Sequence, residues 1–361
     1  MRTIRARTLL PLLTLTSCLF AATQSPLLHV LARFTAPTVP ALGPDEHPVD
    51  RTWSLPSQPA PATTPADLPG HGLAQHPMLY AGEGYNNILL VNQGKVIWNY
   101  FTGPGGEIDD IWLLSDGNIL FTRQSQVEEV TPDKKIIWHY DAPAGTEIHT
   151  CQPIGLDKVL IVQNGLPPKL MILNKETGKV EVDFALPAES LTDPKTVHPQ
   201  FRRVRITAKG TYLLPFLKLN KVVEYDKNFQ EIWSYSIPTP WAAVRLHNGN
   251  TLITDEHGPL VREVNPKSET VWEFTPADLP PGIVLHNIQT SERLANGNTV
   301  IFSSTGGVKA EDRPNTLQAI EVTPDKKLVW VLQDWKNLGP ATTAQVLDQP
   351  GTPEKPGDLQ R

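Results

Sequence analysis

Cysteine is scarce in this chain, which has 361 residues and only two cysteines, Cys18 and Cys151. Cys18 lies in an N-terminal segment that we expect to be removed or lipidated during export. Cys151 then has no intramolecular partner, so the mature protein cannot hold an internal disulfide even in an oxidising compartment. Its stability must therefore come from a buried core and from closure of its strands.

An excess of positive charge is also missing, because 32 basic residues face 38 acidic ones and the net charge is -6. A nucleic-acid-binding protein needs a basic surface, so this class of partner is excluded. The chain also lacks a Walker loop, a GxGxxG motif before a helix, a GxSxG elbow and a CxxC pair. The commonest signals of nucleotide binding, serine hydrolysis and thiol redox chemistry are therefore absent.

Long apolar runs are limited to the N-terminus, where a basic "MRTIRAR" precedes the short apolar stretch "TLLPLLTLTSCLFAA". This pattern predicts an export signal over residues 1–22. Residues 15–18, Leu-Thr-Ser-Cys, resemble a bacterial lipobox, which makes Cys18 a candidate for lipidation. An ordinary secretory cut near Ala21 or Ala22 and an uncleaved anchor remain alternatives. We expect an exported bacterial protein that is periplasmic, attached to the outer membrane as a lipoprotein, or secreted, and that meets a membrane only through such a lipid.

Two segments lack apolar periodicity and are rich in Pro, Ala and Thr, a composition typical of extended linkers. We expect residues 23–75 to form a tether and residues 350–361 to form a disordered tail. The folded domain is then expected over residues 76–349.

One short phrase occurs twice, as "EVTPDKKIIW" at residues 129–138 and as "EVTPDKKLVW" at residues 321–330. Weaker copies end at Trp98, Val182, Trp233 and Trp272. Each copy has an apolar strand, a polar turn, and a second strand that ends on a bulky residue, so each predicts a β-hairpin. We expect the recurring Trp residues to pack between neighbouring units.

A second phrase precedes most copies, as in "SDGNILF" at residues 115–121 and "HNGNTLI" at residues 247–253. Asp-Gly and Asn-Gly pairs between apolar runs favour tight hairpin turns, so each unit is a four-stranded meander. Six such units predict an all-β, six-bladed β-propeller. The first unit lacks its opening strand, and "TTAQVLDQ" at residues 342–349 is a strand without a hairpin. We therefore expect this C-terminal strand to complete the first blade and close the ring.

Polar residues gather where the innermost strand of each blade should begin. Because these starts meet at one mouth of the axial channel, we take them as a candidate site. The candidate catalytic residues are His149, His198 and His286, and the candidate ligand-binding residues are Asp110, Gln152, Gln200, Arg203, Trp241, Arg245 and Gln289. The alternative is a channel filled with water whose polar groups are structural. Arg245 and Arg293 are then either solvated or packed between blades, a role that we favour for Arg293.

Histidine and arginine donate hydrogen bonds, so this set favours a small anionic or aryl ligand. A metal is not predicted, since the histidines lie on separate blades and no HxH or HxxxH pair is present. A calcium-dependent hydrolase would need several Asp, Glu and Asn side chains at the mouth, and only Asp109, Asp110 and Asn287 are candidates. The partner is then a small molecule or a protein at the axial mouth, and the chain is expected to be a monomer.

The stretch "NGNTLITDEHGPLVREVNPKSETVWEF" resembles the repeat of bacterial arylsulfotransferase-like propellers, and "NKETGKVEVDF" is similar to the repeat of quinoprotein-like propellers. The resemblance implies an exported six-bladed enzyme that passes sulfate between phenols through a histidine in the axial channel, helped by other histidines and an arginine. His149, His198 and His286, with Arg203 or Arg245, are the similar residues here. The chain departs from that family because it has only a tether before the propeller and cannot form the disulfide of the family.

Two further expectations follow from this comparison. No cofactor is predicted, and pyrroloquinoline quinone (PQQ) is not expected, because quinone-dependent enzymes need a larger ring, a metal site and usually vicinal cysteines. Since one fold serves many activities, a non-catalytic binding or scaffold propeller displayed outside the cell is the alternative function.

Overall fold

The computed structural model describes residues 26–34 and 75–361, apart from residues 83, 104, 105, 257, 259, 282, 284 and 310. The expected signal peptide, the lipidation candidate Cys18 and most of the expected tether lie outside the described residues. Within them, no helix is long and apolar enough to cross a membrane.

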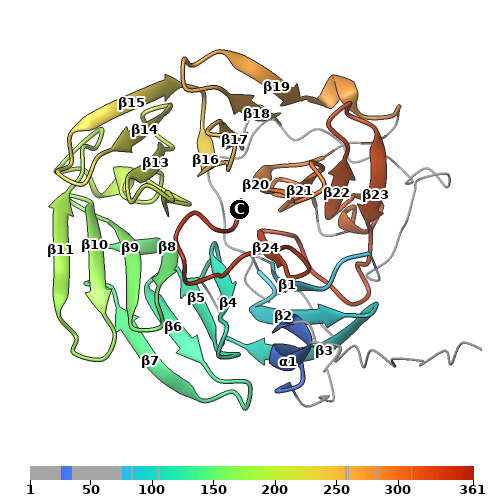
Figure 1. The fold of residues 1–361 in the computed structure, drawn as a ribbon, viewed down its shortest axis with the longest axis horizontal. Coiled ribbons are helices and arrows are strands. Elements are labelled where there is room, and N and C mark those ends of the chain that lie inside the picture. Colours follow the sequence, from blue (N-terminus) through green and yellow to red (C-terminus); the bar gives the residue numbers. More distant parts are fainter. Residues whose placement is uncertain are drawn as a thin grey trace, which may run out of the picture.

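The chain forms a ring of six antiparallel sheets, each with four strands, which confirms the six-bladed β-propeller (Figure 1). Blade 1 holds, from the axis outward, β24 (Thr343–Val346), β1 (Met78–Ala81), β2 (Asn87–Asn92) and β3 (Lys95–Phe101). Blade 2 consists of β4 (Ile111–Leu113), β5 (Ile119–Arg123), β6 (Gln126–Val130) and β7 (Ile136–Asp141). Blade 3 consists of β8 (Glu147–Ile154), β9 (Lys158–Asn164), β10 (Lys169–Asn174) and β11 (Val180–Ala185).

The remaining three blades follow the same order from the axis to the rim. Blade 4 consists of β12 (Arg205–Ile206), β13 (Tyr212–Phe216), β14 (Lys221–Tyr225) and β15 (Glu231–Ser236). Blade 5 consists of β16 (Pro240–Arg245), β17 (Thr251–Asp255), β18 (Leu260–Val264) and β19 (Thr270–Phe274). Blade 6 consists of β20 (Ile288–Arg293), β21 (Thr299–Ser303), β22 (Ala319–Val322) and β23 (Leu328–Leu332). Short 3-10 turns occur at Pro194–Thr196, Pro276–Asp278 and Arg313–Asn315.

Closure of the ring follows the prediction, because β24 from the C-terminal region pairs antiparallel with β1, from Met78 opposite Val346 to Ala81 opposite Thr343. His76, just before β1, reinforces this junction. Its Nδ1 lies 3.2 Å from Asp348 Oδ2 and its Nε2 lies 3.0 Å from Glu321 Oε2 of blade 6. Both ends of the domain are thus tied to one another without a disulfide.

The repeated phrases form hairpins because their turns accept a left-handed backbone. Gly249 of an Asn-Gly turn has φ +88°, a conformation that glycine adopts without a steric penalty. In the two identical turns "TPDKK", Lys134 and Lys326 have φ of 67° and 66°. The register shifts by one residue beside each of them, between Glu129 and Val130 and between Glu321 and Val322. Each copy therefore carries a bulge that starts its outer strand.

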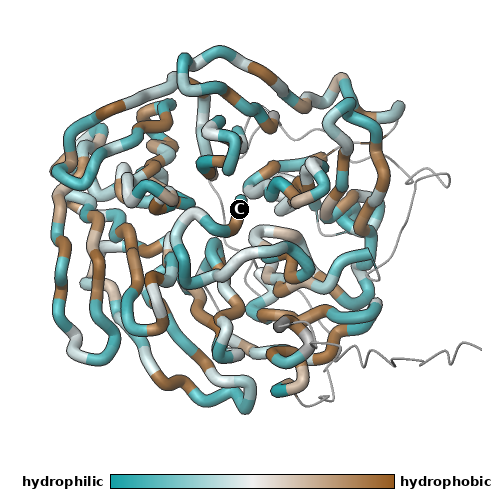
Figure 2. Tube along the Cα trace, viewed as in Figure 1, coloured by the Kyte–Doolittle hydropathy of each residue, from teal (hydrophilic) through white to brown (hydrophobic). Residues whose placement is uncertain are grey.

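The core lies within and between the blades, where apolar residues gather, while the turns at the rim are polar (Figure 2). The tryptophans pack as expected. Trp98 of blade 1 is 1% exposed and donates to the carbonyl of Pro132 in the outer turn of blade 2, at 2.8 Å. Trp233 and Trp272 make equivalent bonds, to Ser268 of blade 5 and to Pro324 of blade 6. The outer strands β3, β15 and β19 are thereby fixed to the next blade.

Four blades share a further link, in which a buried glutamate on the third strand meets a cation of the next blade. Glu224 accepts from Arg245, and Glu263 accepts from Arg293 at 2.8 Å. These arginines also lie over the rings of Trp233 and Trp272. The equivalent pairs are Glu129 with Lys175 and Glu321 with His76. The blades are therefore joined by charge-assisted bonds as well as by apolar contacts.

Part of the expected tether is ordered. Helix α1 (Pro26–Leu31) and the turn after it place Val30, Leu31 and Phe34 in the core between blades 1 and 2. Phe34 meets the Trp98 ring edge-on, with the ring centroids 5.5 Å apart. The prediction of a featureless tether from residue 23 is wrong for residues 26–34, because these apolar side chains bury surface against the propeller.

The expectation of a disordered tail over residues 350–361 is also wrong. After β24 the chain turns back and crosses one mouth of the channel, so that its end lies at the axis of the ring (Figure 1). Glu354 accepts from the amides of Ser115 and Gly155, and Gln360 bonds to His247 and Arg293. Gly357, at φ +79°, approaches Ala208 so closely that a Cβ would lie 2.2 Å from its amide nitrogen. Such contacts with blades 2 to 6 hold the tail in place.

Candidate functional site

The six innermost strands run side by side in one direction, so their starts meet at one mouth of the channel and their ends at the other. Contacts between blades 2 and 3 illustrate this alignment. Asp109, just before β4, bonds to His149 of β8, and the next residue, Asp110, accepts from the amide of Cys151 further along β8. The tail closes the mouth where the strands end. We call the other one the open mouth, and it carries the largest cluster of titratable side chains along the axis.

His149 lies at the centre of this cluster and is 1% exposed. Its Nδ1 donates to Asp109 Oδ2 at 2.5 Å, and its Nε2 donates to Glu147 Oε2 at 2.9 Å. Glu107 Oε2 lies 3.5 Å from the same Nδ1. Because both ring nitrogens face carboxylates, His149 is placed to carry a positive charge.

His198 lies nearer to solvent, with 23% of its side chain exposed. Its Nδ1 donates to Glu147 Oε2 at 2.7 Å, and its Nε2 accepts from Arg202 Nη2 at 2.8 Å. The rings of His149 and His198 meet edge-on, with centroids 5.5 Å apart. A continuous hydrogen-bonded chain thus leads from buried Asp109 through His149 and Glu147 to His198 and Arg202.

The pKa values follow from these contacts. Burial and the Arg202 charge lower the pKa of His149, but its hydrogen bonds to Asp109 and Glu147 outweigh them and leave it raised. Burial, followed by the charge of Glu107, raises the pKa of Asp109. Burial, followed by the Arg202 charge, lowers the pKa of His198. His149 therefore holds its ring proton more firmly than an ordinary histidine does, and His198 stays neutral near pH 7.

Glu147 behaves differently from the other two carboxylates. Burial raises its pKa, yet the hydrogen bonds from His149 and His198 outweigh burial, so the pKa lies well below its usual range. Its side chain is 22% exposed. Glu147 is therefore an ionised carboxylate that a ligand at the open mouth can reach.

Trp241, a predicted ligand-binding residue, is fully buried. Arg202 lies over its ring, 4.7 Å from the centroid. Arg202 itself is 0% exposed, and its Nη1 donates to the carbonyls of His198 and Phe201. Trp241 therefore supports Arg202 from behind and offers no free face for stacking an aryl ligand.

Asp110 and Arg203 lie deeper in the channel, one layer below the cluster. Asp110 accepts two bonds from Arg205, at 2.8 and 2.9 Å, and lies 3.5 Å from Arg203. Arg203 also donates to Thr343 of blade 1, and Arg361 of the tail lies over the Trp112 ring. Burial raises the pKa of Asp110, but the Arg205 and Arg203 charges outweigh it and lower the value. Asp110 is thus shared by several arginines, and these contacts link blades 1, 2 and 4 to the tail.

His286 begins blade 6 as expected, but no contact joins it to His149 or His198 in the described part of the chain. Its backbone bonds to Ser303, and its Nε2 is buried without a hydrogen-bond partner among the described residues. Burial lowers its pKa. Gln289 donates to Glu256 at 3.3 Å. Blade 6 therefore forms a separate polar region, and the prediction of one site with three histidines reduces to a pair.

The other predicted ligand-binding residues bond within the protein. Gln152 accepts from the amide of Ile206, and Gln200 bonds to both backbone groups of Gly165. Arg245 stands at the far end of β16, where it links blades 4 and 5. These contacts give all three a structural role.

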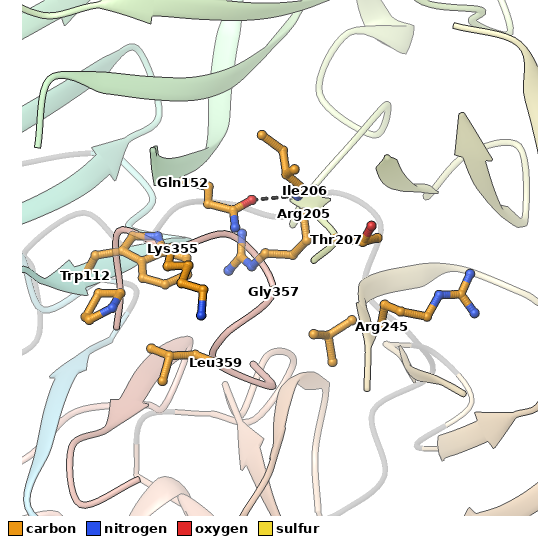
Figure 3. A pocket seen from close by; sticks show the side chains of 11 residues that line it. Trp112, Gln152, Arg205, Ile206, Thr207, Arg245, Lys355, Gly357 and Leu359 are labelled. Atoms are coloured by element: carbon orange, nitrogen blue, oxygen red, sulfur yellow. Dashed lines mark hydrogen bonds between the residues drawn. The ribbon is translucent and has the colours of Figure 1, made fainter. Parts of the chain in front are cut away.

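A pocket beside the tail lies at the closed mouth, away from the histidine pair (Figure 3). Its lining includes Trp112, Gln152, Arg205 and, from the tail, Lys355 and Leu359. In Figure 3 the guanidinium of Arg245 points away from the pocket. The polar groups of the pocket already bond within the protein, as Gln152 does to the amide of Ile206, Arg205 to Asp110 and Lys355 to Asp358. We therefore take the open mouth as the stronger candidate site.

Glu107 and Glu147 were missed as site residues by the sequence analysis. Both are followed by isoleucine at the start of a blade, in "EIDDIW" and "EIHTCQP", and this repeated pair was the available signal. Arg203 was chosen from the sequence instead of its neighbour Arg202. Adjacent residues on an extended chain face opposite ways, so only Arg202 joins this cluster. The assembled cluster, with three carboxylates, two imidazoles and one guanidinium, can transfer protons, bind a cation, or hold a polar ligand.

The comparisons with known proteins support the fold. No protein-family model matches the chain, and no curated protein matches it. A protein of unknown function from Bacteroides caccae is 25% identical over 74% of this chain and 97% of its own, with a TM-score of 0.66. Virginiamycin B lyase from Staphylococcus aureus, 12% identical, covers 72% of this chain and 82% of its own with a TM-score of 0.50.

A third similar structure is the extracellular domain of a candidate hybrid two-component system of Bacteroides thetaiotaomicron. It is 12% identical and covers 79% of this chain and 36% of its own, with a TM-score of 0.50. The chain is thus similar to β-propeller proteins, while the resemblance to arylsulfotransferases in particular stays a prediction.

Proposed function

We propose that this protein is an exported enzyme that binds a small polar ligand at the open mouth of its channel and acts on it by general acid–base chemistry. The hydrogen-bonded chain from Asp109 to His198 carries the proposal. It ends at two groups that a ligand can reach, His198 and Glu147, and it is held from behind by buried partners. Such support fixes the orientation of the outer groups, which proton transfer requires.

The charge of the cluster argues for a neutral or cationic ligand. Glu107, Asp109 and Glu147 place three carboxylates around the histidine pair, against two positive charges, those of Arg202 and of a protonated His149. An anion entering the mouth would meet net negative charge in a poorly screened site. The anionic ligand expected from the sequence depended on the histidines together with Arg203 and Arg245, and these two arginines pair with Asp110 and Glu224.

Arylsulfotransferase-like transfer is the second candidate, and one observation favours it. His198 is neutral, and its Nε2 lone pair points to Arg202, the group best placed to stabilise a sulfuryl oxygen. In that reaction Nε2 would attack sulfur, the S–O bond to the first phenol would break, and a second phenol would take the sulfuryl group from His198. Binding without turnover, as in a scaffold propeller, is the remaining possibility.

Chromogenic esters separate these functions. The full chain is assayed with 4-nitrophenyl acetate, 4-nitrophenyl sulfate with phenol as acceptor, and a cationic ester, 4-nitrophenyl trimethylammonioacetate. We expect turnover of the neutral or cationic ester, and a loss of about a hundredfold or more in H198A, as removal of a general acid or base causes. H139A is the matched control, because His139 lies exposed on the outer strand β7.

Each other outcome has a meaning. Turnover of the sulfate alone would establish the second candidate. If H198A and E147Q act on every ester as fast as the unmodified protein, the open mouth is not the catalytic site. Export is supported by the N-terminal sequence and agrees with the extracellular placement of one structural neighbour, and it is tested by cell fractionation of the protein and of C18A.

A further inference from the structure

We infer that a divalent transition-metal ion, such as Zn²⁺, binds between Glu107, His149 and His198. This inference rests on the proposed function, because the metal ion would occupy the same mouth of the channel. One donor atom from each residue lies within 4.8 Å of the other two. Glu107 stands in the middle, 3.5 Å from His149 Nδ1 and 3.7 Å from His198 Nε2. Ligand atoms around tetrahedral zinc lie roughly 3.3 Å apart, given bonds of about 2.0 Å, so small movements complete the site.

Asp109 is a further carboxylate beside His149, outside the three residues whose donor atoms lie within 4.8 Å of one another. Its Oδ2 lies against His149 Nδ1, and its Oδ1 is buried without a hydrogen-bond partner among the described residues. Asp109 is 1% exposed. A buried carboxylate oxygen without a partner is costly and calls for a ligand. Two imidazoles and one carboxylate suit zinc and its transition-metal neighbours better than calcium, which prefers oxygen alone.

The charge of the cluster also matches a divalent cation. A metal ion takes the place of a proton on His149, and with both imidazoles neutral, three carboxylates face the single guanidinium of Arg202, which leaves two negative charges in excess. A divalent ion balances this excess. Glu147 then stays outside the ligand set, bonded to His149 Nε2 and His198 Nδ1, the nitrogens that face away from the metal. Such a carboxylate orients metal-bound imidazoles and can accept a proton from the ligand side.

Arg202 competes with the metal in this arrangement. Its Nη2 donates to His198 Nε2, the atom that must turn to the ion, and lies 3.8 Å from Glu107 Oε2. Removal of the guanidinium should therefore strengthen metal binding, whereas removal of a ligand should weaken it. A cluster that serves only as a metal-free salt-bridge network would show no such opposition, because both changes would only lower stability.

The experiment titrates chelator-treated full chain with Co²⁺, followed by visible absorption, and with Zn²⁺ by calorimetry. We expect one ion per chain, with an affinity reduced at least about tenfold in E107Q, as loss of a ligand or its support causes. R202M, which keeps the apolar contact with Trp241, should bind more tightly. H247A, altered at the closed mouth, should bind as the unmodified protein does. Melting temperatures confirm that each variant is folded.

Absence of Co²⁺ and Zn²⁺ binding at micromolar concentrations, or equal affinity in E107Q and the unmodified protein, would overturn the inference. The two proposals fail separately. If metal does not bind but H198A still loses ester turnover, only the metal site is refuted. If metal binds as expected but no ester is turned over, the metal site stands and the acid–base function is refuted.

Discussion

His76 offers a sharp test of how the ring is closed. It precedes β1, is 6% exposed, and contacts Asp348 after β24, Glu321 of blade 6 and the edge of Trp330. Burial lowers its pKa, but the hydrogen bonds to Asp348 and Glu321 outweigh burial and raise the pKa from 6.5 to about 9. We predict that H76Q weakens closure, and that the loss depends on pH.

The magnitude follows from the two pKa values. Each pH unit between them corresponds to about 1.4 kcal/mol, so the charged pairing stabilises the folded state by about 3.5 kcal/mol at most. The side chain of Asp348 is 38% exposed, and solvent screening there reduces the expected effect to about 2 kcal/mol. Because the folded pKa is raised, this stability is fully present below pH 6.5 and is lost as pH rises through about 9.

The assay is urea unfolding of the unmodified protein and of H76Q between pH 6 and pH 10. The difference in unfolding free energy should be about 2 kcal/mol at pH 6 and should shrink steadily above pH 7. H139Q, altered on an exposed outer strand, controls for the loss of a histidine as such. A difference that stays constant from pH 6 to pH 10 would refute the claim that a charged His76 holds the two ends together.

Three further substitutions test the packing. W98A should lower the free energy of unfolding by about 3–5 kcal/mol because it removes the contact between blades 1 and 2. Its control is F101A on the same strand, where Phe101 is 60% exposed, and this variant should change the free energy little in the same urea unfolding assay. D110N should lower the free energy of unfolding by about 3–5 kcal/mol because it leaves buried Arg203 and Arg205 without their carboxylate. D141N, at an exposed position, is its control, and an unchanged stability of D110N would contradict the ion network in the middle of the channel. L359A should cost about 2 kcal/mol and expose backbone amides of the tail to hydrogen exchange, and unchanged exchange would show that the tail is not held by its apolar contact.

The fold was largely predictable because the sequence repeats one structural unit. The two "TPDKK" turns, the Asn-Gly turns and the recurring Trp each specify local geometry, and six copies have few ways to bury their faces other than a ring. The tail and α1 were missed for the opposite reason. They have no period, and residues such as Leu359 and Phe34 are single apolar anchors in segments whose composition otherwise indicates linkers.

The site was predicted less well because its contacts depend on register across blades. Sequence position placed His149, His198 and His286 at equivalent points, but only His149 and His198 meet. Adjacent residues diverge in role in the same way, since Arg202 joins the open mouth while Arg203 turns toward Asp110. A single chain does not reveal which side of an inner strand faces its neighbour, and the carboxylates Glu107 and Glu147 are visible as partners only once that alignment is known.

The most direct test of the account is a crystal structure of the protein soaked with a compound that it binds or turns over. The account predicts electron density for the compound at the open mouth, within hydrogen-bond distance of His198 and Glu147. A compound bound instead beside the tail at the closed mouth, or on the outer rim of the ring, would contradict it.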